Sequence, residues 1–150
     1  MADPGLLYPI EPGPRANHMA EADADLGLTP EERFLYNMHL TNLHGRGRLE
    51  QPDGSISSLI QMSFEGPGGK TYNIPTLWGG RQLPPHDAIR EAEKVGLDKF
   101  PSYASGDEAE ARYQAMHDYL ARDTGDFLQP NQPAPAMRYW PPPGLLDGGL

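Results

Sequence analysis

Five histidines are the side chains of this sequence that could most readily bind a transition metal or carry protons. His39 and His44 flank an expected turn, His86 precedes an aspartate, and His18 and His117 stand apart. A helical zinc site needs two histidines four residues apart on one helix, together with a third ligand. Because these histidines lack that arrangement, we interpret them as surface or helix-capping residues and expect neither a metal nor a cofactor.

Two pairs of acids could serve glycoside cleavage, a reaction that uses two carboxyl groups across the scissile bond. They are Glu31 with Glu32, and Glu108 with Glu110. Both pairs fall in the first turn of an expected helix, where the helix dipole favours negative charge, so we expect no catalytic residue there. Residues 45–48 (GRGR) are too short for a phosphate-binding loop and lack its lysine. We interpret them as a basic turn or a contact for an acidic neighbour.

The composition of the chain argues against several classes of protein. The chain has 150 residues and a net charge of −9, which disfavours sequence-specific binding to nucleic acid because such binding needs clustered Lys and Arg. It contains no Cys, which excludes disulfides and thiol catalysis. The sequence contains no apolar run long enough to predict a membrane span, and the residues after Met1 do not resemble an export signal.

Except for His18, these acids and histidines must be positioned by a central segment, residues 29–122, which contains regularly spaced turn and helix-capping signals. Thr29, Pro30 and Glu32 form the capping pattern that starts a helix, and the apolar spacing predicts about 14 helical residues ending before Gly45. Further along, Pro85 opens a second predicted helix that Gly96 stops, with Ala88, Ile89, Ala92 and Val95 on its inner face. A second capping box at residues 105–108 opens a third, expected to persist to Arg122.

Strand signals lie between the first two predicted helices. Residues 60–65 alternate apolar and polar side chains, residues 66–69 (GPGG) form a turn, and residues 70–76 form the partner strand. Pro75 cannot donate to a ladder, so that strand should lie at an edge or stop there. Gly79 and Gly80 predict a second tight hairpin. The sequence therefore predicts an α+β fold: a small antiparallel β-hairpin or meander packed with about three helices, flanked by extended proline-rich arms.

The two arms, residues 1–28 and 123–150, are rich in proline, and the first also carries an acidic patch. Regular structure is not expected in them, and composition alone favours disorder. Both arms nevertheless contain apolar anchors that solvated linkers seldom have, so we interpret them as partner-binding segments. The candidate anchors are Leu6, Leu7, Tyr8, Ile10, Met137, Tyr139, Trp140, Leu145 and Leu146. The repeat of PGLL at residues 4–7 and 143–146 is either chance or two copies of one docking motif.

Several short phrases in the central segment resemble a small module found in tailed-bacteriophage virion-associated proteins, in its freestanding form. The chain departs from that pattern at Pro84 and Pro85, where the module has a Ser or Asp cap. The matching phrases, in order, are residues 51–57 (QPDGSIS), 61–64 (QMSF), 72–76 (YNIPT), 79–81 (GGR), 87–89 (DAI), 95–96 (VG), 100–102 (FPS) and 108–111 (EAEA).

The resemblance leaves the chemistry of the module undefined, but together with the long anchored arms it leads us to expect a structural protein of a phage particle rather than an enzyme. We expect a tail, portal-proximal or internal component, the last ejected with the genome, made in the host cytoplasm and located in the virion. Its arms would bridge neighbouring tail, portal or adaptor subunits, in multiple copies within a symmetric assembly. Two alternatives stay open: an accessory to peptidoglycan degradation during entry, and a head decoration protein.

Overall fold

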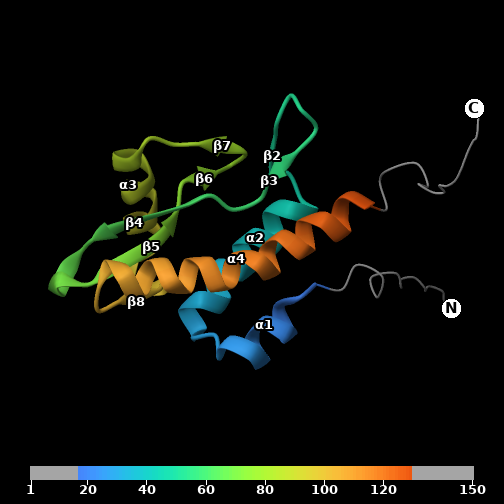
Figure 1. Ribbon diagram of the computed structural model, residues 1–150. Coiled ribbons are helices and arrows are strands. Elements are labelled where there is room, and N and C mark those ends of the chain that lie inside the picture. Colours follow the sequence, from blue (N-terminus) through green and yellow to red (C-terminus); the bar gives the residue numbers. More distant parts are fainter. Residues whose placement is uncertain (1–16, 130–150) are drawn as a thin grey trace, which may run out of the picture. The chain divides into compact units, whose positions relative to one another are not determined.

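The computed structural model describes residues 17–129 and confirms the α+β fold class (Figure 1). The described residues 17–124 belong to one compact unit, called the hub from here on, and the described residues 125–129 belong to another. The elements in chain order are α1 (Met19–Leu26), α2 (Pro30–His44), β2 (Leu49–Glu50), β3 (Ile56–Ser57), β4 (Gln61–Glu65), η3 (Pro67–Gly69), β5 (Thr71–Pro75), β6 (Leu77–Trp78), β7 (Arg81–Gln82), α3 (Pro85–Val95), η4 (Leu97–Lys99), β8 (Ser102–Tyr103) and α4 (Gly106–Leu128).

The main sheet has three antiparallel strands in the order β4-β5-β8. Its predicted hairpin is confirmed, with Met62 opposite Ile74 in the register of β4 and β5. β5 ends at Pro75, as expected, although it is the central strand rather than an edge strand. The proline is tolerated because β8 pairs only with Thr71 and Tyr72, so no strand on that side requires an N–H from Pro75.

The predicted helix start, helix stop and tight turn are present in the structure. The Thr29 hydroxyl accepts from the Glu32 N–H at 3.1 Å, and the Glu32 carboxylate accepts from the Thr29 N–H at 3.0 Å, which completes the capping box of α2. α3 begins at Pro85 with no side-chain cap and ends at Val95, with Gly96 as its C-cap. The β6–β7 hairpin turns through Gly79 and Gly80, whose φ angles of 59° and 79° explain why glycine stands at both positions.

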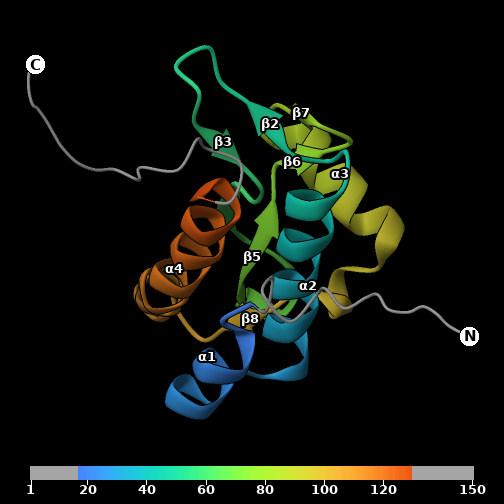
Figure 2. The ribbon, with the colours of Figure 1, turned by 90° about the vertical axis from the view of Figure 1, so that its right-hand side faces the viewer.

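α2 joins two hydrophobic clusters, because adjacent residues of this helix enter different ones. Leu35 packs with Ile74 of β5, with Phe100 and with two alanines of α3. Tyr36 packs on the other side with Met116, Tyr119 and Leu120 of α4 and with Ala22 of α1. Figure 2 shows α2 and α4 flanking β5 in that view. The core therefore depends on both faces of α2.

Two boundary predictions and one burial prediction are wrong. Residues 1–28 were expected to lack regular structure, but residues 19–26 form α1, because Ala22 and the following Leu28 are buried against the cluster around Tyr36. α4 was expected to end near Arg122 but continues to Leu128, which places Asp123 inside the hub. Val95, expected on the inner face of α3, is exposed, while Ala88 and Ala92 are buried.

No helix among residues 17–129 is long and apolar enough to cross a membrane.

Candidate functional site

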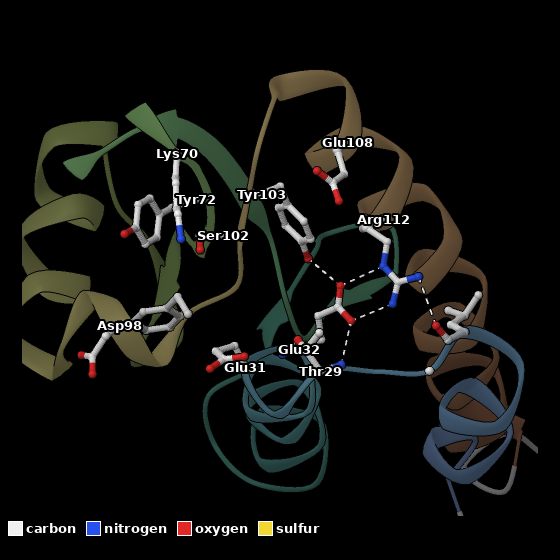
Figure 3. Close-up of a pocket in the computed structure, with 13 residues that line it drawn as sticks. Thr29, Glu31, Glu32, Lys70, Tyr72, Asp98, Ser102, Tyr103, Glu108 and Arg112 are labelled. Atoms are coloured by element: carbon white, nitrogen blue, oxygen red, sulfur yellow. Dashed lines mark hydrogen bonds and ion pairs between the residues drawn. The ribbon is translucent and has the colours of Figure 1, made fainter. Parts of the chain in front are cut away.

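An ion pair between a buried carboxylate and a half-buried guanidinium joins the start of α2 to α4. Glu32 is 0% exposed, and Arg112 donates to both of its carboxylate oxygens, from Nη2 to Oε1 at 2.7 Å and from Nε to Oε2 at 2.9 Å. The Tyr103 hydroxyl donates to the same Oε2 at 2.7 Å. Figure 3 shows the carboxylate between the guanidinium and the phenol. Glu32 therefore does more than cap its helix, which is all that the sequence indicated.

The charge of Glu32 is stabilised by these contacts. Burial alone would raise the pKa of Glu32, but the hydrogen bonds from Arg112, Tyr103 and the Thr29 N–H together hold that pKa below its usual value. The hydrogen bond to Glu32 in turn raises the pKa of Arg112. Burial, followed by the hydrogen bond to Glu32, raises the pKa of Tyr103. A carboxylate kept ionised in this way cannot serve as the general acid of a glycosidase, which must hold a proton near neutral pH.

A pocket of about 530 Å³ opens beside this ion pair. Glu32 and Arg112 line one side of it, and Lys70, Tyr72 and Ser102 line the other (Figure 3). The Glu108 carboxylate at its rim accepts from the Ala104 N–H at 3.0 Å and so fixes the start of α4. Among the described residues, no group of acids and histidines is arranged to hold a metal ion.

A second buried polar cluster lies further along the same two helices. The Asp123 carboxylate of α4 accepts from the Tyr36 hydroxyl at 2.6 Å and from the His18 backbone N–H at 2.6 Å, and it lies 3.2 Å from His39 Nε2. His39 Nδ1 is 2.5 Å from the Ser58 hydroxyl. Burial alone would raise the pKa of Asp123, but its hydrogen bonds hold that pKa below the usual value.

The interpretation of His39 as a surface residue is wrong. Its side chain is 0% exposed, because it shares the inward face of α2 with Tyr36, three residues earlier, and with Leu43, four residues later. This helical spacing was the sequence signal that could have found it. His44, His86 and His117 are exposed, as interpreted. The candidate anchors in the arms all lie outside the described residues.

Asn73 of β5 connects four of the phrases that carry the resemblance. Its side chain accepts from the Ser63 hydroxyl at 2.6 Å and donates to the Ala109 carbonyl at 3.1 Å. Its backbone N–H donates to the Pro101 carbonyl at 3.0 Å. The Asn73 side chain is 2% exposed, so these bonds replace water inside the hub. The phrases of the resemblance therefore meet in space and hold β4, β5 and α4 together.

The residues of another matching phrase, residues 51–57, also bond to one another. The Asp53 carboxylate accepts from both the N–H and the hydroxyl of Ser55, at 2.9 and 2.6 Å, and Gly54 has a φ of 91°. An aspartate that bonds its own backbone two residues on, followed by a residue at positive φ, defines a tight turn. In this phrase, too, the matching residues shape the backbone.

A comparison with protein-family models, with curated proteins and with solved structures finds no match for this chain.

Proposed function

We propose that this chain is a structural component of a tailed-bacteriophage particle, in which the hub is a rigid body and the arms bind neighbouring subunits. The observation that carries the proposal is the convergence of four matching phrases on Asn73. Ser63 and Asn73 are register partners in the β4–β5 hairpin, and Asn73 also bonds to the Pro101 and Ala109 carbonyls, so the matching phrases build one part of the hub. Their joint role in the hub supports a shared fold with the phage module.

The buried polar clusters support a role in which fixed geometry matters. Glu32 with Arg112, and Asp123 with Tyr36 and His39, connect α2 to α4 at two separate levels. Buried ionic groups add little net stability compared with apolar residues, but they penalise any rearrangement that separates the partners. A subunit that must present its two ends to neighbours in a repeated geometry would use such connections.

The arms supply the means of attachment in this proposal. Apolar side chains such as Leu7, Tyr8 and Trp140 lie among prolines, which lose little entropy when an extended segment docks. Aromatic residues that fill a partner's pocket commonly dominate the binding energy of an interface. The partners are tail, portal or adaptor subunits, and the protein is present in several copies within a symmetric assembly.

Immunogold labelling of purified particles tests the proposal, with antibodies raised against the hub and particles from the phage whose genome carries the gene. The expected result is gold at the tail or at the portal vertex, with label appearing after mild disruption if the protein is internal. Gold spread evenly over the capsid would instead identify a head decoration protein. A gene that lies in no phage or prophage genome would contradict the proposal at once.

A cell-wall zymogram of the full chain distinguishes the structural role from the remaining alternative, an accessory to peptidoglycan degradation. The expected result is no clearing of the peptidoglycan. Clearing that disappears in the Glu108→Gln variant would place the protein with the wall-degrading machinery and would contradict a purely structural role.

A further inference from the structure

We propose that Ser58, His39 and Asp123 form a nucleophilic relay through which Ser58 takes an acyl group from a small ester bound in the neighbouring cavity. The three side chains form one chain of contacts, 2.5 Å from the Ser58 hydroxyl to His39 Nδ1 and 3.2 Å from His39 Nε2 to Asp123. A hydroxyl, an imidazole and a carboxylate in this order are the parts of an activated serine. This inference goes beyond the structural role proposed above and does not depend on it.

The direction of the relay follows from the charge of Asp123. An ionised carboxylate only accepts hydrogen bonds, so the nitrogen that faces it, His39 Nε2, carries the proton. In the neutral imidazole the other nitrogen, Nδ1, is then the acceptor, and the Ser58 hydroxyl donates to it. Asp123 thus selects the tautomer in which His39 can act as a base toward Ser58.

The surroundings hold this arrangement in place. Tyr36 and the His18 backbone N–H both donate to Asp123 and fix the position of its carboxylate. Asn42 donates from its side chain to the Ser58 carbonyl at 2.9 Å and fixes the backbone that carries the nucleophile. The three relay residues are between 0% and 5% exposed, so bulk water does not compete for their hydrogen bonds.

Ser58 also lines a cavity of about 230 Å³ between the segment that follows β3 and the middle of α4. Ile56, Leu59 and Leu120 give this cavity an apolar lining, while Gln61 and Thr124 contribute polar groups. Its volume limits the substrate to a small acyl group, and its mixed lining fits a short carboxylic ester. Ser58 therefore borders a space that is large enough for a small ester.

The chemical step needs no cofactor. As Ser58 Oγ bonds to the carbonyl carbon of the ester, its proton passes to His39 Nδ1. The bond between that carbon and the leaving alcohol oxygen breaks, and the alcohol takes the proton from His39. Water then cleaves the new ester on Ser58, releasing the carboxylic acid and restoring the hydroxyl.

A small alkyl fluorophosphonate, which loses fluoride to an activated serine, tests the inference on the full chain. Peptide mass spectrometry locates the adduct after reaction under native conditions and, as a control, in urea. The expected result is an adduct on Ser58 that forms only in the folded protein. No adduct on native Ser58, or equal labelling of other serines, would overturn the inference, and this comparison needs no variant.

Variants then test the relay itself. His39→Gln and Asp123→Asn should each slow labelling of Ser58 by about 100-fold or more, since each removes the base or its orientation. His86→Gln is the matched control, because His86 is exposed on α3 and lies outside both the relay and the cavity, and this variant should be labelled on Ser58 at the normal rate. Thermal melts confirm that each variant is folded. A folded His39→Gln variant that labels Ser58 at the normal rate would also overturn the inference.

Discussion

Arg112 and Glu32 lie 80 residues apart in the chain, yet the guanidinium of one meets both carboxylate oxygens of the other. The remaining nitrogen of Arg112, Nη1, donates to the Leu26 carbonyl at 3.2 Å. One side chain of α4 thus holds the end of α1 and the start of α2 at the same time. This junction fixes how the N-terminal part of the hub meets the rest.

Arg112→Ala should therefore destabilise the hub strongly. The change leaves the Glu32 carboxylate buried without its cation, which costs about 3–5 kcal/mol in comparable cases. Urea denaturation measures the loss. Arg90→Ala is the matched control, because Arg90 pairs with Asp87 on the exposed side of α3 and should change stability by only about 0–1 kcal/mol. Equal effects of the two substitutions would contradict the structural importance of the Glu32–Arg112 pair.

The hub should lose stability in acid. Glu32 and Asp123 both have pKa values below those of the unfolded chain, so each contributes stability that is fully present above the unfolded value of about 4 and is lost as pH falls through the lowered folded value. Melting temperatures measured from neutral pH downward should fall steeply below pH about 4.

The variant Glu32→Gln provides the control for this pH dependence. It cannot ionise at this position, so its melting temperature should be lower at neutral pH and should change less between neutral and acidic pH. A variant with the same acid dependence as the native chain would show that Glu32 does not contribute to it.

Asn73→Ala should weaken the connection between the sheet and α4. It removes the partner of the Ala109 carbonyl and of the Ser63 hydroxyl, and such unsatisfied buried groups cost about 1–3 kcal/mol. Hydrogen exchange should then be faster in β5 and in the first turns of α4. Asn37→Ala, on the exposed face of α2, is the control and should leave exchange unchanged.

Local signals in the sequence predicted much of this fold because the interactions behind them are local. The Thr29–Glu32 capping box, the Gly79–Gly80 turn and the stop at Gly96 each involve residues within one turn of each other. α1 was missed although Met19, Ala22 and Leu26 recur at helical spacing, because Ala22 is a weak apolar signal among acids.

The buried clusters could not be predicted in the same way. Arg112 and Asp123 are far along the chain from Glu32 and His39, and nothing in the local pattern indicates which distant charge will meet which. Glu32 was assigned to a helix end, which is correct but incomplete, since the same carboxylate also binds Arg112. The polar side chains at inward positions of α2 were the available hint that a polar partner had to lie opposite.

The double variant Trp140→Ala with Leu145→Ala should separate attachment from folding. Both positions lie outside the hub, so the melting temperature of the purified protein should not change. Incorporation into particles should fall sharply, because the substitutions remove two candidate anchors from the C-terminal arm. Deletion of residues 129–150 should have the same effect. Normal incorporation of the deleted form would place attachment on the hub or on the Leu6–Tyr8 segment.

The copy number of the protein in purified particles tests the central claim most directly. Quantitative mass spectrometry with labelled standard peptides from the hub measures it against the major capsid protein, in particles purified through two successive gradients. A structural component should be present at a fixed copy number that matches the symmetry of a ring or vertex and is the same in every preparation. A protein that is abundant in the infected lysate but absent from the particles, or present in amounts that vary between preparations, would contradict the account.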